Sequence, residues 1–88
     1  MMPRYQQQPD LIAADLGGET VMMSISTGKY FALRGIGHFI WEFLSEPASI
    51  DEVVGAIETR YEVDREQAQT DCEAFINELV AKDLLKQS

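Results

Sequence analysis

The sequence predicts an α+β domain of winged-helix-like type, with a three-stranded antiparallel sheet followed by three helices. Two observations support this prediction. The N-terminal part alternates apolar and polar residues between glycine-containing turns, as β-hairpins do. The remainder spaces its apolar residues three and four apart behind helix-capping signals, as amphipathic helices do. The chain has 88 residues, the length of one domain.

Three strands are expected in the N-terminal half. Residues 11–16 form the first, and Gly17-Gly18 form a two-residue turn because glycines tolerate positive φ. Residues 19–25 form the second strand, and a loop ending at Gly28 leads into the third, residues 29–33. In such a meander the second strand is central, so the first and third are edges. On the second strand one face carries Val21, Met23 and Ile25, and the other carries Met22 and Ser24.

The first two helices are expected over residues 36–45 and 50–60. The first has an apolar stripe flanked by Trp41; the stripe consists of Ile36, Phe39, Ile40, Phe43 and Leu44. The second begins behind a capping box, in which the Ser49 side chain caps the helix and Glu52 reaches back. Leu84 and Leu85 close the chain as a final extended segment.

The third helix is expected over residues 65–82, behind a second capping box that begins at Asp64. Its central stripe consists of Ala68, Cys72, Phe75 and Leu79. One flank of the stripe is apolar (Ile76, Val80), and the other is polar (Asp71, Glu78, Lys82). The apolar face is therefore wider than a single core contact needs.

Composition restricts the partners and the setting. The formal net charge is −8, and it falls entirely within residues 35–88, which carry 12 acidic and 4 basic residues. Such a surface repels phosphate backbones, so no nucleic-acid partner is expected, whereas a neutral or basic peptide would be attracted. Apolar runs are too short for a membrane span, so no membrane association is expected. The single cysteine and the lack of a signal-peptide pattern favour a cytoplasmic setting.

Residues 1–10 are expected to be a mobile N-terminal tail, and residues 11–88 the single domain. No catalytic residue is predicted, because His38 and Cys72 lack a third orienting group and a lone buried cysteine usually acts as a small hydrophobe. One histidine and one cysteine do not suggest a zinc site, and no phosphate-binding glycine loop leads into a helix. Neither a metal nor a cofactor is expected.

The third strand is the candidate site. An edge strand presents unpaired N–H and C=O groups, which a soluble protein either protects or uses. One use is to capture an extended peptide as an additional strand, and pairing of two copies into a homodimer is another. The expected binding residues are the strand with its flanks and the face of the last helix: Lys29, Tyr30, Phe31, Ala32, Leu33, Arg34, Cys72, Phe75, Ile76, Leu79 and Val80. Ile76 and Val80 are expected to line the groove, and Cys72, Phe75 and Leu79 to form its floor.

Five segments resemble the PqqD-like family, in order and spacing. They are Ser26-Thr27-Gly28-Lys29-Tyr30-Phe31-x-Leu33, Gly35-x-Gly37-x-x-Ile40-Trp41-x-x-Leu44, Ser49-Ile50-Asp51-Glu52-Val53-Val54, Tyr61-x-Val63-Asp64, and Asp71-x-x-x-Phe75-x-x-x-Leu79-x-x-x-Asp83-Leu84-Leu85. The chain departs from the family at Arg34, where Asn is frequent, and at Asp83, where Gly is frequent.

The resemblance implies a non-catalytic protein of ribosomal-peptide modification pathways, most like the stand-alone proteins of lasso-peptide operons. Such a protein binds a precursor's leader segment beside the third strand and presents it to a partner leader peptidase or modifying enzyme. The pyrroloquinoline-quinone branch, with a radical enzyme as partner, is an alternative. A winged-helix transcription regulator is another, although the acidic third helix argues against DNA binding.

Overall fold

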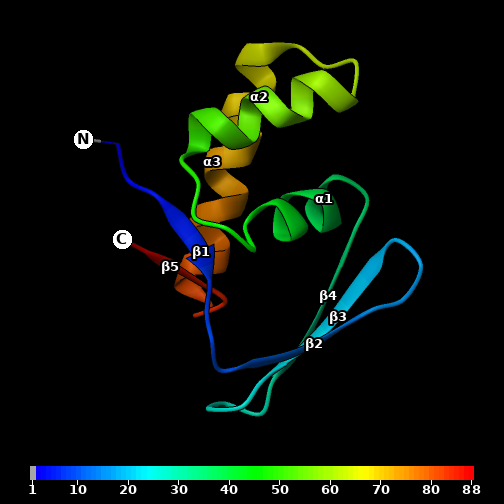
Figure 1. The fold of residues 1–88 in the computed structure, drawn as a ribbon, viewed down its shortest axis with the longest axis vertical. Helices are drawn as coiled ribbons and strands as arrows, with labels where there is room; N and C mark the ends of the chain where they lie inside the picture. The colour runs from blue at the N-terminus through cyan, green and yellow to red at the C-terminus, as the bar shows by residue number, and fades with distance from the viewer. Residues whose placement is uncertain (1) are drawn as a thin grey trace.

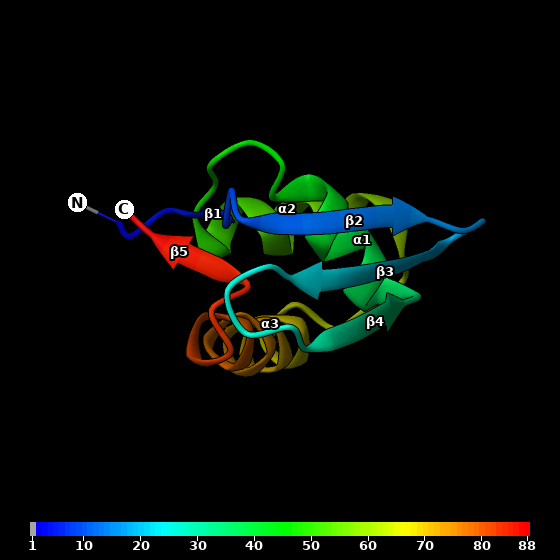
Figure 2. The ribbon, with the colours of Figure 1, turned by 90° about the horizontal axis from the view of Figure 1, so that it is seen from below.

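The computed structural model describes residues 2–88. In chain order the elements are β1 (Tyr5–Gln7), β2 (Leu11–Asp15), β3 (Glu19–Ser24), β4 (Tyr30–Arg34), α1 (Ile36–Phe43), α2 (Ile50–Arg60), α3 (Arg65–Ala81) and β5 (Leu85–Gln87) (Figure 1). Strands β2, β3 and β4 form an antiparallel sheet in that order, and β1 pairs with β5 separately. Figure 2 shows α1 and α2 behind the three-stranded sheet and α3 on its β4 side. The predicted fold class, a three-stranded antiparallel sheet followed by three helices, is confirmed.

Both hairpins form as the glycines predict. The Leu16 N–H donates to the Glu19 carbonyl at 2.7 Å, and Gly17 and Gly18 have φ of 67° and 90°. At the second turn the Gly28 N–H donates to the Ser24 carbonyl at 2.8 Å, and Gly28 has φ of 72°. These positive φ values suit glycine, which has no Cβ to clash. The turns place β4 beside β3, at the end of the strand order β2-β3-β4.

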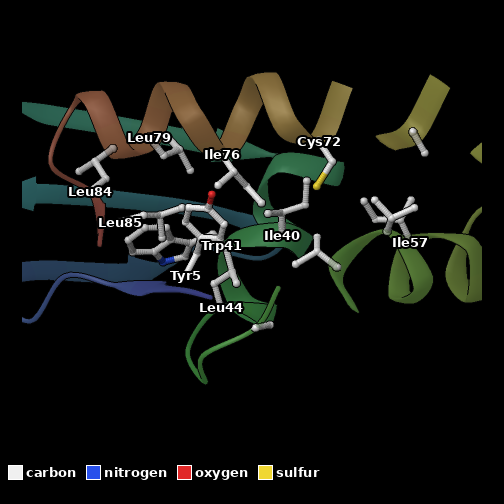
Figure 3. Close-up of a cluster of buried hydrophobic side chains, with 14 of the residues drawn as sticks. Tyr5, Ile40, Trp41, Leu44, Ile57, Cys72, Ile76, Leu79, Leu84 and Leu85 are labelled. Atoms are coloured by element: carbon white, nitrogen blue, oxygen red, sulfur yellow. The ribbon is translucent and has the colours of Figure 1, made fainter. Parts of the chain in front are cut away.

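The structure differs from the mobile tail predicted for residues 1–10. Within residues 1–10, the segment Tyr5–Gln7 is strand β1 and pairs antiparallel with β5. The Tyr5 N–H also donates to the Ala48 carbonyl at 2.8 Å, and the Gln7 Nε2 donates to the Trp41 carbonyl at 2.7 Å. Tyr5 is only 6% exposed and lies in the core close to Trp41 and Leu85 (Figure 3). The domain therefore begins at β1 and not at residue 11, because an aromatic side chain and a strand near the start of the chain complete the core.

The core is one cluster between the helices and the inner face of the sheet. On β3 the buried residues are Thr20, Met22 and Ser24. The opposite face, which includes Val21 and Met23, is only half-buried.

The α1 stripe is rotated slightly from the prediction. Ile40, Trp41 and Leu44 are buried, whereas Ile36 is 40% and Phe43 37% exposed. Trp41 is therefore a core residue, and Ile36 remains available at the surface.

The end of α3 has a reversed backbone at Asp83, whose φ is 59°. The Leu84 N–H donates back to the Leu79 carbonyl at 2.9 Å, and the Asp83 N–H donates to the Val80 carbonyl at 3.0 Å. Glycine normally occupies this left-handed position, and aspartate tolerates it better than most other residues do. The helix thus ends as a glycine-capped helix would, and Leu84 turns into the core, where it is fully buried.

Helix α2 begins with the predicted capping box: the Ser49 Oγ accepts from the Glu52 N–H, and the Ser49 N–H donates to the Glu52 carboxylate. At α3 only half of the predicted box forms, because Asp64 accepts from the Gln67 N–H while the Gln67 amide donates to Asp71. Among residues 2–88, no helix combines the length and hydropathy needed to cross a bilayer.

Candidate functional site

The backbone of β4 has an inner and an outer row of polar groups. The Ser24 N–H donates to the Lys29 carbonyl at 3.0 Å, so this pair of residues is hydrogen-bonded across β3 and β4. Hydrogen-bonded pairs alternate with non-bonded pairs along an antiparallel ladder. With the register Met22–Phe31 and Thr20–Leu33, the backbone groups of Phe31 and Leu33 therefore face β3. Those of Tyr30, Ala32 and Arg34 face outward.

No other strand covers this outer row in the part of the chain that the structure describes, because β4 is the last strand in the order β2-β3-β4. The side chains alternate as well. Phe31 and Leu33 are half-buried on the helix side, while Tyr30 is 74% exposed on the other face. Lys29 precedes the strand, and its side chain is exposed. The edge therefore offers both unpaired backbone groups and two apolar side chains that point toward the helices.

An apolar groove of about 610 Å³ lies next to this edge. It is bounded by the end of β4, the start of α1, the end of α2 with the segment before α3, and the first half of α3. Its lining consists of Ala32, Leu33, Arg34, Ile36, Gly37, Ile40, Ile57, Val63, Asp64, Gln67, Ala68, Asp71, Cys72 and Phe75. A concave apolar site with a few polar groups at its margin is typical of ligand-binding pockets.

Among the expected groove residues, Cys72 and Phe75 do line the groove, and Ile76 and Leu79 do not. Ile76 is fully buried and Leu79 is 3% exposed, both within the core cluster. Figure 3 shows these two side chains pointing from α3 toward Tyr5 and Leu85. Val80 packs against the same core and is not part of the groove lining. The groove therefore lies on a different face of α3 from the predicted flank, because Ile76 packs into the core and Val80 packs against it.

The groove lies along the polar flank of α3 instead. Gln67, Asp71 and Phe75 contribute to its wall, and the Lys82 ammonium is 5.9 Å from the centre of the Phe31 ring. The groove lining includes Ile36, Gly37, Gln67 and Asp71, which were not among the predicted site residues. Gly37 was the one sequence signal for this wall, because a glycine within a helix can mark a close approach of another side chain. A Cβ added at Gly37 would lie 3.2 Å from the Phe75 Cζ atom. The lack of a side chain at Gly37 therefore leaves room for the Phe75 ring.

Two cations beside the groove are already paired. The Arg34 Nε is 2.7 Å from a Glu19 carboxylate oxygen, and the Lys82 Nζ is 2.9 Å from a Glu78 carboxylate oxygen. Both pairs are exposed and contribute little to stability, about 0–1 kcal/mol each. Their effect at the site is to neutralise the charges of Arg34 and Lys82 beside the groove.

The Cys72 thiol is a poor nucleophile. Burial raises the pKa of Cys72 to about 11, with a further contribution from the Glu73 carboxylate. The thiolate, which is the reactive form, is therefore scarce at neutral pH. His38 has a different partner, since its Nδ1 lies 2.7 Å from the Thr20 hydroxyl oxygen. The Cys72 side chain acts as part of the apolar groove floor.

One cluster within residues 2–88 brings three potential metal ligands together. Oxygen or nitrogen atoms of Asp15, His38 and Glu42 lie within 4.8 Å of one another. Thr20 bridges the last two, because its hydroxyl also donates to the Glu42 carboxylate at 3.4 Å. Asp15 and Glu42 are exposed. Thr20 on β3 thus joins the sheet to α1 through His38 and Glu42, and the cluster is separate from the groove lining.

The fold and the site together define a class: a small winged-helix-like α+β domain with a free sheet edge beside an apolar groove. Residues 19–85 match the model of the family described as coenzyme PQQ synthesis protein D (PqqD), and the chain belongs to this family. No curated protein compared with the chain gives a significant match.

Two solved structures are similar to the chain. One is TbiB1 in complex with the TbiA(beta) leader peptide, at 33% identity and a TM-score of 0.86, covering 92% of this chain and 94% of that one. The other is a lasso peptide synthetase B1 complexed with the leader peptide, at 22% identity and a TM-score of 0.81, covering 93% and 96%. The second supports the fold, and the first also supports the family.

Proposed function

We propose that this protein binds the leader segment of a precursor peptide by adding it as a strand to β4. It then presents the peptide to a partner leader peptidase or modifying enzyme of the lasso-peptide type. The observation that carries the proposal is the outward-facing backbone of Tyr30, Ala32 and Arg34 next to an apolar groove. The likeness to TbiB1, which was solved with a leader peptide, supports it.

The energetics of strand addition are favourable at this site. Three residues with outward N–H and C=O groups offer up to six backbone hydrogen bonds. Each contributes about 0.5–1.5 kcal/mol net, against about 2–5 kcal/mol for ordering a flexible peptide. Alternate side chains of the added strand face the groove, where burial of apolar surface supplies the remainder. Binding then raises the effective concentration of the peptide at its enzyme.

The partner enzyme distinguishes two versions of this function. In the lasso-peptide version it is a leader peptidase, and in the pyrroloquinoline-quinone version it is a radical enzyme. The 33% identity to TbiB1 over most of both chains favours the first. A DNA-binding role is disfavoured, because the groove-side flank of α3 carries Asp71 and Glu78 and its Lys82 is paired with Glu78. Pairing of two copies through β4 would compete with the peptide, so added peptide should convert any homodimer to monomer.

Amide hydrogen exchange tests the proposal, with the TbiA(beta) leader peptide and a displayed library of random peptides as probes. The N–H groups of Phe31 and Leu33 should be protected without peptide, because they face β3. Those of Tyr30, Ala32 and Arg34 should become protected only when a peptide binds. A peptide that binds and leaves these three amides unprotected would contradict strand addition to β4. Failure of every probe to bind would contradict peptide recognition itself.

A further inference from the structure

We infer that the groove selects a peptide with a lysine or arginine opposite Asp71, next to an apolar residue that contacts Phe75. This inference rests on the proposed function and specifies the chemistry of the peptide. It follows from how α3 lies along β4 and from which charges at the groove are already paired.

Helix α3 runs along β4 in the opposite direction. Near the start of β4, the Phe31 ring faces Lys82 from the end of the helix. Near the end of β4, Leu33 and Arg34 share the groove with Phe75 and Asp71, one helical turn apart. A strand placed between them would run along the same flank of α3.

The repeat distances of strand and helix nearly match. Alternate side chains of a strand are about 6.6 Å apart, and one turn of α-helix rises about 5.4 Å. Successive groove-facing side chains of the added strand would therefore meet successive turns of α3. One of them meets the turn of Phe75, and the side chain two residues away meets the turn of Asp71. The first environment is apolar and the second is acidic.

Among residues 2–88, the two groove carboxylates, Asp64 and Asp71, form no ion pair, and only Asp71 is free of a helix-capping role. Arg34 is paired with Glu19, and Lys82 is paired with Glu78. Asp64, the other acidic residue of the lining, caps α3 by accepting from the Gln67 N–H at 3.0 Å. Among residues 2–88, Asp71 accepts a hydrogen bond only from the neutral Gln67 amide, at 3.0 Å, and forms no ion pair within 4.0 Å.

A guest strand would change the surroundings of this carboxylate. It would cover part of the groove and displace water from the Asp71 side chain, and that cost is offset if the guest supplies a cation. A lysine or arginine reaches the carboxylate with a long apolar stem that can lie on the groove wall, with its charged end at the margin. An acidic guest residue would meet like charge and an unpaired carboxylate, so it would be rejected. Asp71 is thus a specificity-determining residue and not a catalytic one.

The test is a charge exchange with a matched control on the same helix. A displayed library of random peptides is selected on the wild-type protein, on Asp71→Lys and on Glu73→Lys. Glu73 is exposed and does not line the groove, so its substitution changes the net charge of the protein equally without replacing a residue of the groove lining. Both positions are exposed, so each variant should fold, and circular dichroism is the check.

The wild-type protein should enrich lysine or arginine at one position, two residues from an apolar position. Asp71→Lys should enrich aspartate or glutamate at that same position, whereas Glu73→Lys should retain the basic preference. For one selected peptide, alanine in place of its basic residue should raise Kd by about fivefold on the wild-type protein and not on Asp71→Asn.

Two results from the variants would overturn the inference. One is a basic preference that survives in Asp71→Lys, and the other is an equal loss in Asp71→Lys and Glu73→Lys, which would indicate general charge attraction only. A wild-type protein that enriches no peptide would overturn the proposed function itself. Enrichment without a basic position would overturn only the assignment to Asp71.

Discussion

Substitution of Ala32 by proline tests whether the outward-facing backbone groups of β4 bind the peptide. The Ala32 N–H faces outward by the alternation that begins at the Ser24–Lys29 pair, so proline removes a donor that no strand of the domain uses. Proline is tolerated in edge strands where its nitrogen faces solvent. Its fixed φ is compatible with an extended strand, and the preceding residue, Phe31, is already extended. The fold should therefore survive.

The cost to binding can be estimated from one lost hydrogen bond. Of the three outward N–H groups, at Tyr30, Ala32 and Arg34, the central one is lost. A lost bond costs about 0.5–1.5 kcal/mol, and the guest carbonyl that remains unpaired adds to this. A total of about 1.4 kcal/mol corresponds to a tenfold higher Kd. By contrast, proline at Leu33 removes a donor to β3 and an apolar side chain, so the domain itself should be destabilised.

The measurement combines two readouts on each variant. Fluorescence anisotropy with a labelled peptide selected on the wild-type protein gives Kd, and urea unfolding gives the free energy of unfolding. Ala32→Pro should change Kd by about tenfold and the free energy of unfolding by less than about 1 kcal/mol, and Leu33→Pro should change mainly the latter. If Ala32→Pro binds as tightly as wild type, the peptide does not pair with β4. If it unfolds the domain, the assignment of inner and outer rows is wrong.

Three further predictions concern the groove wall, the end of α3 and the buried thiol. Gly37→Ala places a Cβ 3.2 Å from the Phe75 Cζ atom, so the ring must give way by a few tenths of an ångström. We expect weaker peptide binding by titration, by about threefold, because the groove wall is displaced. The free energy of unfolding should be unchanged or up to about 1 kcal/mol higher, because alanine favours helix. Equal binding by Gly37→Ala would show that this wall does not contact the peptide. Asp83→Gly relieves the positive φ of 59° and should raise the free energy of unfolding by about 1 kcal/mol in a thermal melt; no gain would mean that Asp83 is unstrained. The pKa of Cys72 is raised to about 11 in the folded state, so its contribution to stability is complete below the pKa of an unfolded thiol, about 8.5, and is lost as pH rises through about 11. Urea unfolding across this range should show a loss of up to about 1.4 kcal/mol per pH unit that Cys72→Ala lacks, and identical pH profiles would contradict a buried thiol.

Local patterns in the sequence were sufficient for the elements and their order. Glycines at the two hairpins set the turns, and Ser49 with Glu52 set the start of α2, because these effects act within a few residues. Two consecutive hairpins make the second strand central, so the third strand has one edge that its neighbours in the meander do not pair with. Tertiary structure decided that this edge stays uncovered in the described residues, because β1 and β5 pair with each other and not with β4.

The faces of the elements were decided by tertiary structure. The second strand offered Val21 and Met23 on one face, yet Thr20 and Met22 face the core, because the helices pack on that side of the sheet. Periodicity identifies which residues share a face and does not say which face another element will cover.

The position of the groove is the clearest case in which periodicity did not show which face of an element would be covered. The last helix has an apolar flank at Ile76 and a polar flank at Asp71, and the sequence made the apolar flank the natural choice for a ligand. Strands β1 and β5, which are almost the whole chain length apart in sequence, pair with each other, and Ile76 packs into the same core as Tyr5 and Leu85. The groove therefore lies along the polar flank of α3, next to Phe75. A contact between the two ends of a chain leaves no local signal, so only the folded structure could place the groove.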